Sequence, residues 1–147
     1  MRTNPPPPDR RLIYLLNVAQ RRVQRFIATQ RGGATPAQGG LLFVLGKQDG
    51  LSMGEAGAAL DLGLPGISGL AERMTEAGLI DKRADPADGR TSRLWLTGAG
   101  RKELARAKAS AAGINTRLMD GFTEAEIDIV ARWLKAVQTK FPKGDDE

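Results

Sequence analysis

Apolar residues recur at steps of three and four along most of this chain of 147 residues, which is the spacing of one face of an α-helix. The first such segment starts at Asp9 and predicts one long amphipathic helix. It should end near Arg31, because Gly32 and Gly33 follow directly and glycine favours helix ends. The apolar positions of this predicted helix are Leu12, Leu15, Leu16, Ala19, Val23, Phe26 and Ile27.

Two capping boxes mark the next helix starts, at Thr35 and Ser52. In each, the hydroxyl and a Gln or Glu side chain three residues later satisfy free backbone amides at the helix start. The first helix should stop around Asp49-Gly50 and the second at Gly63. Pro65 then suits the first turn of another helix, which glycine at 78 should close. The residues that this helix should bury are Ile67, Leu70, Ala71 and Met74.

After Leu79 the apolar period changes from about 3.6 to two, which is typical of strands. We expect strands over 80–84 and 92–96, joined by the turn-rich segment 85–90. The pair predicts a β-hairpin with Leu94 and Leu96 facing in and Arg93 and Trp95 facing out.

Two further helices should follow the hairpin, one capped by Thr97 over 99–119 and one opened by a third capping box at Thr123 over 124–141. Their apolar positions again step by three and four. One small domain cannot cover these stripes and that of the first helix, so dimerisation is the simplest way to bury them. Residues 143–147 should form a frayed tail.

Cysteine and histidine are both missing from the sequence. This excludes disulfides, thiol nucleophiles, thiol redox sensors and zinc sites built from Cys and His. Acid–base chemistry would have to use carboxylates, lysines or the single tyrosine. We therefore expect no catalytic residues, no metal site, no cofactor and no enzymatic activity.

The net charge of +5 is unevenly distributed. Residues 1–31 carry 7 basic and 1 acidic residue and residues 81–108 carry 8 and 4, whereas residues 32–80 carry 2 and 5. Two basic blocks around an acidic middle favour a surface for a polyanion. The start of the chain runs into Pro5–Pro8 rather than into an apolar segment, and no apolar run approaches the roughly 18 to 20 residues of a membrane span. We expect a cytoplasmic protein with no membrane partner.

The stretch from Leu62 to Leu104 resembles the MarR family of bacterial transcriptional regulators. The segments that carry the resemblance are Glu72–Ile80, Asp85–Arg90 and Leu96–Arg101. The most specific feature is an acidic-Pro turn followed by an Asp-x-Arg step and a Leu-Thr-x-x-Gly-Arg helix start.

The resemblance implies a mainly α fold with a small β-hairpin wing. A flexible Pro-rich arm over 1–9 would precede a single MarR-like unit over 10–147. Within it, 35–97 would form a winged helix-turn-helix, and the helices of 10–31 and 99–142 would form a dimerisation layer. The implied function is a homodimeric repressor that binds double-stranded DNA and is released by a small aromatic or phenolic effector.

Several site residues follow from the resemblance. Arg90 matches the wing-tip arginine that enters the minor groove, and Asp88 and Asp85 match the acidic residues that shape the wing. Arg73 matches an arginine in the latter half of the recognition helix, which contacts phosphate or pairs with a wing acid. For the wing residues, the alternative is a solvated Asp-Gly turn in which Arg90 contacts nothing.

The front of the recognition helix departs from the family pattern, because Ser68 is the only hydrogen-bonding side chain between Gly63 and Gly69. Direct readout of bases needs side chains that reach base edges, so base specificity is in doubt. Gly66 and Gly69 permit close approach either of a neighbouring helix or of DNA. The remaining candidates for phosphate contact are Lys82, Arg83 and Arg93.

Candidate ligand-cleft residues are the aromatics Trp95, Tyr14 and Phe43, with Trp133 and Phe26 also considered; ordinary packing is the alternative for each. A second hypothesis keeps the fold but drops specific DNA binding. In it the chain is a degenerate paralogue that acts through protein or ligand contacts.

Overall fold

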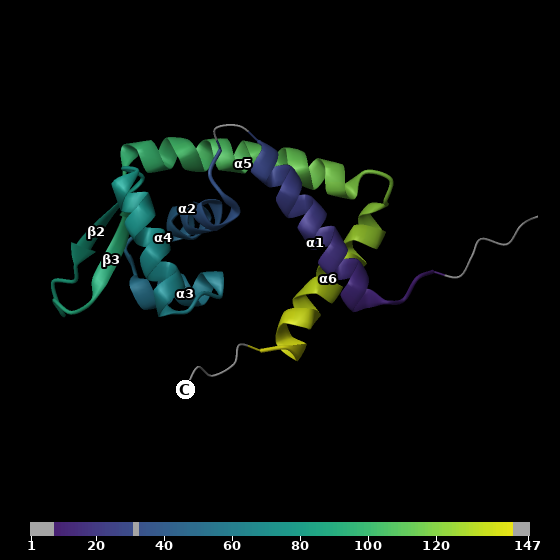
Figure 1. Ribbon diagram of the computed structural model, residues 1–147, viewed down its shortest axis with the longest axis horizontal. Coiled ribbons are helices and arrows are strands. Elements are labelled where there is room, and N and C mark those ends of the chain that lie inside the picture. The colour runs from purple at the N-terminus through teal and green to yellow at the C-terminus, as the bar shows by residue number, and fades with distance from the viewer. Residues whose placement is uncertain (1–7, 31–32, 143–147) are drawn as a thin grey trace, which may run out of the picture.

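The computed structural model describes residues 8–30 and 33–142, so most of the Pro-rich arm, Arg31 (the expected end of the first helix), Gly32 and the tail over 143–147 lie outside the described residues. Within these residues the chain forms six helices and a small antiparallel sheet (Figure 1). The elements are α1 (Leu12–Thr29), α2 (Pro36–Lys47), β1 (Leu51–Ser52), α3 (Met53–Leu60), α4 (Leu64–Glu76), β2 (Ile80–Ala84), β3 (Ser92–Leu96), α5 (Gly98–Met119) and α6 (Glu124–Lys140). The predicted fold class, mainly α with a hairpin wing, is confirmed.

All three predicted capping boxes form, at Thr35, Ser52 and Thr123. At Ser52, for example, the backbone N–H donates to Glu55 at 2.8 Å and the hydroxyl accepts from the Glu55 N–H at 3.1 Å. Thr97 caps α5 by accepting from the Gly100 N–H at 3.0 Å. These local signals place the helix starts correctly because each depends only on residues a few positions apart.

Two helices end slightly before the glycines that were expected to stop them. Helix α3 ends at Leu60 because Asp61 adopts the left-handed conformation, with φ of 58°, two residues before Gly63. Gly63 is extended and is instead the N-cap of α4. Helix α1 runs only from Leu12 to Thr29, with Gln30 as an extended C-cap, so it stops before the glycine pair.

The sheet has the strand order β1-β3-β2, and the predicted hairpin forms with the expected strand ends. The strand that the sequence did not predict is β1, a two-residue strand that pairs Leu51 with Leu94. Leu94 and Leu96 face the core, at 0% and 8% exposure, as predicted. Trp95 lies on the opposite face but is half-buried, because its ring covers Gly50.

The hydrophobic core lies between α2, α3, α4 and the sheet, and includes all four residues that α4 was predicted to bury. Figure 1 shows this winged part at one end of the molecule and α1 and α6 at the other, with the long helix α5 spanning both. The core residues are Leu41, Leu42, Leu45, Leu51, Ala56, Ile67, Leu70, Ala71, Met74, Ile80, Leu94, Leu96 and Leu104.

Helices α1 and α6 bury no residue within the chain. Their apolar stripes are instead exposed, and so is the end of α5, where Leu118 is 53% exposed. The exposed large hydrophobics of this end are Leu12, Ile13, Tyr14, Leu15, Leu16, Phe26, Leu118, Met119, Phe122, Ile129, Val130, Leu134 and Phe141. So large an apolar surface on one end of a chain is typical of a protein–protein interface.

The first turn of α5 lies directly against the turn between α4 and β2. The Thr97 hydroxyl donates to the Gly78 carbonyl at 2.6 Å, and the Thr97 N–H donates to the Leu79 carbonyl at 3.1 Å. Gly100 makes this approach possible, because a Cβ on it would overlap the Leu79 carbonyl group. Gly98, two residues earlier, has nothing within 4 Å of the corresponding Cβ position.

We expect Gly100→Ala to lower the free energy of unfolding by about 1–3 kcal/mol, because the added methyl forces α5 away from the α4–β2 turn. Gly98→Ala is the matched control. It should leave stability unchanged or raise it by up to about 1 kcal/mol through helix propensity. Urea unfolding followed by circular dichroism measures both. Equal stability of the two variants would contradict this assignment of Gly100.

Candidate nucleic-acid interface and cavity

The connection between β2 and β3 is shaped by two aspartates that each bind a backbone amide two residues ahead. Asp85 accepts from the Ala87 N–H at 2.9 Å, and Asp88 accepts from the Arg90 N–H at 3.0 Å. The Asp85 N–H donates to the Thr91 carbonyl at 2.8 Å and closes the loop. Such side-chain turns fix the backbone locally, so Arg90 is held at the tip of a defined wing.

Arg93 is engaged within the fold. Its Nε donates to Asp85 at 2.7 Å, its Nη1 donates to the Gly50 carbonyl at 2.8 Å, and Nη1 lies 3.9 Å from the Glu55 carboxylate. These bonds join the base of the wing to the segment before β1. Arg93, predicted as a phosphate contact, is therefore placed as a support of the wing.

The pKa of the Asp85 carboxyl is lowered, first by the hydrogen bond from the Ala87 N–H and then by the one from Arg93. The pKa of Glu55 is also lowered, mainly because its carboxylate accepts the Ser52 N–H at the start of α3. Both carboxylates are thus stabilised in the ionised form by the contacts that build the wing and the helix start.

The other predicted cations occupy different surroundings. Arg83 pairs with Asp81 at 3.2 Å, and its guanidinium lies 5.5 Å from the centre of the Trp95 ring. Lys82 lies on the opposite face of the hairpin, in register with Leu94. Three other basic residues are exposed and form no ion pair with any described residue: Arg73, Lys82 and Arg90.

The front of α4 presents little polar chemistry to solvent. Ser68 is exposed, and so are Leu64, Pro65 and Gly66. A Cβ on Gly66 would meet only the Leu62 side chain, at 3.6 Å. A Cβ on Gly69 would meet only Nη1 of Arg73, at 3.4 Å. Within the described chain, no neighbouring helix needs either of these glycines for close approach.

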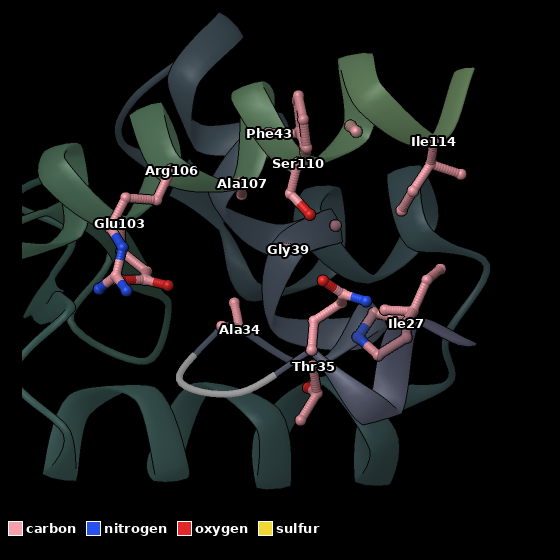
Figure 2. Close-up of a pocket in the computed structure, with 15 residues that line it drawn as sticks. Ile27, Ala34, Thr35, Gly39, Phe43, Glu103, Arg106, Ala107, Ser110 and Ile114 are labelled. Atoms are coloured by element: carbon pink, nitrogen blue, oxygen red, sulfur yellow. The ribbon is translucent and has the colours of Figure 1, made fainter. Parts of the chain in front are cut away.

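A cavity of about 430 Å³ lies between the end of α1, the start of α2 and the middle of α5. Its apolar part includes Ile27, Phe43, Ala107 and Ile114, so residues from the predicted dimerisation stripes of α1 and α5 line it. In Figure 2, Arg106 and Glu103 lie at one side of the cavity and Ile27 and Ile114 at the other. This volume and this apolar lining with a few polar groups are typical of small-molecule sites.

The polar lining of the cavity was not predicted from the sequence. It consists of Gln30, Thr35, Ser110 and the ion pair between Arg106 and Glu103, whose Nη1 and Oε2 atoms lie 3.2 Å apart. The Glu103 side chain is 15% exposed and that of Arg106 is 67% exposed. The only signal in the sequence was the three-residue spacing of this pair, which is common on helix surfaces and marks no cavity.

Of the aromatic residues proposed for a ligand cleft, Phe43 lines this cavity. Trp95 lies instead over Gly50 at the wing, and Tyr14 lies near the start of α1 with the Arg11 guanidinium 4.9 Å from its ring centre. Phe26 packs under Arg117, at 4.9 Å, and does not line the cavity, nor does Trp133. Trp95 and Phe26 thus have packing partners within the chain, whereas Tyr14 remains 54% exposed.

Within residues 8–30 and 33–142, no cluster of acidic side chains has the arrangement of a metal site. No helix there is long and apolar enough to span a bilayer.

Comparison with known proteins places this arrangement in a family. A model of the MarR family matches residues 33–91, which contain α2, α3, α4 and the hairpin up to Thr91. The HTH-type transcriptional repressor IacR of Pseudomonas putida is 28% identical over 97 residues. That alignment spans 66% of this chain and 58% of the length of IacR.

Solved structures of the same fold cover more of the chain. The transcriptional repressor CouR, bound to a 23-mer DNA duplex, is 29% identical, with a TM-score of 0.77 over 86% of this chain and 91% of CouR. The PcaV transcriptional regulator of Streptomyces coelicolor, in complex with its natural ligand, is 24% identical, with a TM-score of 0.83 over 88% of this chain and 93% of PcaV. At 24% identity, the likeness to PcaV shows a shared fold.

The hydrogen bonds that Asp85 accepts from Ala87 and Arg93 should make the free energy of unfolding depend on pH. Because the pKa of Asp85 is lower in the folded than in the unfolded state, this carboxylate stabilises the fold fully above the ordinary carboxylate range and loses this contribution as the pH falls below that range and through its own lowered pKa. Asp85→Asn should lower the free energy of unfolding near neutral pH and flatten its fall on acidification. Denaturant unfolding at a series of pH values measures this.

The matched control for Asp85 is Asp81→Asn. Asp81 pairs with Arg83 on the surface, with side chains 53% and 61% exposed, and such pairs contribute little to stability. Asp81→Asn should therefore keep the pH profile of the parent chain. An unchanged profile for Asp85→Asn as well would contradict the wing contacts described here.

Proposed function

Because this chain belongs to the MarR family of winged helix-turn-helix regulators, we propose that it is a homodimeric DNA-binding repressor whose affinity for DNA is lowered by a small aromatic or phenolic effector. The observation that carries this proposal is the wing tip. Asp85 and Asp88 fix the loop, and Arg90 extends from it with no ion pair among the described residues. An arginine held in this way suits a narrow minor groove, where the negative potential is concentrated.

The DNA surface of the proposal combines the wing with the exposed face of α4. Arg73 and Lys82 would contact phosphates beside Arg90, which positions the protein without reading sequence. At the front of α4, Ser68 is the hydrogen-bonding side chain that would contact a base edge. The structural neighbour CouR is bound to a DNA duplex, which supports double-stranded DNA as the partner of this fold.

The homodimer rests on the exposed apolar faces of α1 and α6 and of the end of α5. The helices that carry these faces lie at one end of the molecule (Figure 1), and neither α1 nor α6 has a fully buried residue within a single chain. Pairing of two copies places the two wings apart on one duplex, as expected for a binding site with two related halves.

The effector site of the proposal is the cavity between α1, α2 and α5. Phe43 and Ile114 provide an apolar surface for a ring, and Thr35 and Ser110 provide hydroxyls for a phenol. An aromatic carboxylate would share Arg106 with Glu103, which already binds it. To regulate DNA binding, the ligand must bind the DNA-competent and the DNA-incompetent geometries of the dimer with different affinities. A ligand with equal affinity for both would leave their populations unchanged.

The second candidate function is that of a degenerate paralogue without specific DNA binding. It is favoured by the glycines at the front of α4 and by the acidic balance of residues 32–80. A selection of genomic DNA fragments by the purified chain separates the two functions. A chain that retains no fragment above background at low salt supports the paralogue.

On a selected duplex, we expect Arg90→Ala to weaken binding about 10- to 100-fold at roughly 0.15 M salt, because each dimer loses two minor-groove contacts. The slope of log affinity against log salt should also become shallower, by about one per lost contact. Fluorescence anisotropy measures the affinity, and light scattering of the complex should give the mass of two chains per duplex.

Lys135→Ala removes one positive charge from α6, at the end of the molecule opposite the wing, and serves as the matched control. It should change affinity and salt slope little. If Arg90→Ala and Lys135→Ala bind equally well, the wing tip is not at the DNA. A complex that contains one chain would contradict the dimer.

Ala107→Leu should fill the cavity and abolish the response to effectors while leaving DNA affinity intact. A panel of small phenols and aromatic acids, tested on the parent chain, identifies those that raise the melting temperature and release DNA. The same compounds should do neither with the variant, because the added isobutyl group occupies the space of the ring.

Ala105→Leu places the same side chain on the exposed surface of α5 and should respond as the parent chain does. Reciprocity gives a further check, because a ligand that lowers DNA affinity must itself bind more weakly when DNA is present. Undiminished stabilisation of Ala107→Leu by the active compounds would exclude this cavity as their site.

A further inference from the structure

We propose that Leu64 is a specificity residue that contacts the C5 methyl group of a thymine in the major groove. This inference rests on the DNA-binding function proposed above and goes beyond it by naming the base and the chemical group that is read. Leu64 is the first residue of α4, and its side chain is 69% exposed. The N-terminal residues of a recognition helix are the ones that contact base edges.

The exposure of Leu64 has no explanation in the dimer. Every other large hydrophobic residue that is exposed in the described chain lies in α1, at the end of α5, or in and beside α6. Leu64 alone lies in the winged part, which occupies the opposite end of the molecule (Figure 1). The dimer interface proposed above therefore does not cover it, although α4 buries its other large apolar residues, Ile67, Leu70 and Met74, almost completely.

The surroundings of Leu64 favour DNA as the occupant. Gly63, the N-cap of α4, has no side chain, and a Cβ on Gly66 would meet only the Leu62 side chain, at 3.6 Å. With no long polar side chain in the way, the backbone of this turn can approach the groove floor closely. Ser68, four residues on, shares the face of Leu64 on the helix. The exposed cations Arg73, Lys82 and Arg90 provide charge for the flanking phosphates.

Thymine is the base that fits this chemistry. The major-groove edges of guanine, cytosine and adenine carry no methyl group, whereas thymine presents its C5 methyl group, which apolar side chains contact. A leucine cannot satisfy a donor or acceptor that it desolvates, so contact with another base would carry a cost. We therefore expect one thymine in each half-site to be required at the position that faces Leu64.

The test replaces each thymine of a selected duplex, one at a time, by deoxyuridine, which removes only the methyl group. At one position in each half-site the parent chain should lose about fourfold in affinity, the ratio that corresponds to about 0.8 kcal/mol for one buried CH₂-sized group. Replacement in both half-sites should cost about 15-fold on the same scale. Fluorescence anisotropy at constant salt measures each ratio.

Leu64→Ala should bind the thymine and deoxyuridine duplexes with equal affinity, because the side chain that contacts the methyl is gone. Leu64→Met keeps an apolar chain of similar size and should retain a clear preference for thymine. Ser68→Ala is the matched control on the same face of α4, and it should keep the full thymine preference even where overall affinity falls. Because Leu64 and Ser68 are exposed, thermal melting of all three variants should match the parent chain.

The outcomes separate this inference from the proposed function. A parent chain that retains no DNA fragment overturns the DNA-binding proposal and this assignment with it. A parent chain that binds DNA but shows no thymine preference at any position overturns the assignment alone. So does a preference that Leu64→Ala retains in full.

Discussion

The contact between the first turn of α5 and the turn that follows α4 holds the two halves of this molecule together. Thr97 binds the carbonyls of Gly78 and Leu79, and Gly100 lets the helix backbone lie against Leu79. Asp49 reinforces the joint, since its carboxylate accepts the Leu96 N–H at 2.9 Å and pairs with Arg101 at 2.8 Å. The end of α4 and the start of α5 are thereby fixed to each other.

In the proposed function, this contact between α5 and the α4–β2 turn links the cavity to the wing. Helix α5 is continuous from the joint past the cavity and on to the exposed apolar end (Figure 1). A rigid helix transmits a shift at one end to the other, so a ligand that displaces α5 at Ala107 or Ile114 would move α4 with it. The proposed repressor needs no mobile loop for its switch, only two positions of one helix relative to the partner copy.

Much of the fold was predictable from the sequence because its signals are local. The capping boxes, the hairpin strands and the buried face of α4 depend on residues within a few positions of one another, and all of these formed as predicted. The turn chemistry of Asp85 and Asp88 is local for the same reason, with partners two residues away. By itself, therefore, the sequence determined the winged helix-turn-helix and the loop that carries Arg90.

Tertiary structure alone decided the features that depend on residues far apart in the chain. Arg93 became a support of the wing because it meets Gly50, 43 residues away, and Trp95 packs over the same glycine. The cavity joins α1, α2 and α5, so no local pattern could show that Phe43 lines it and Tyr14 does not. The isolation of Leu64 from the other exposed apolar residues is likewise visible only in three dimensions, because periodicity places a side chain on a face but does not say what covers that face.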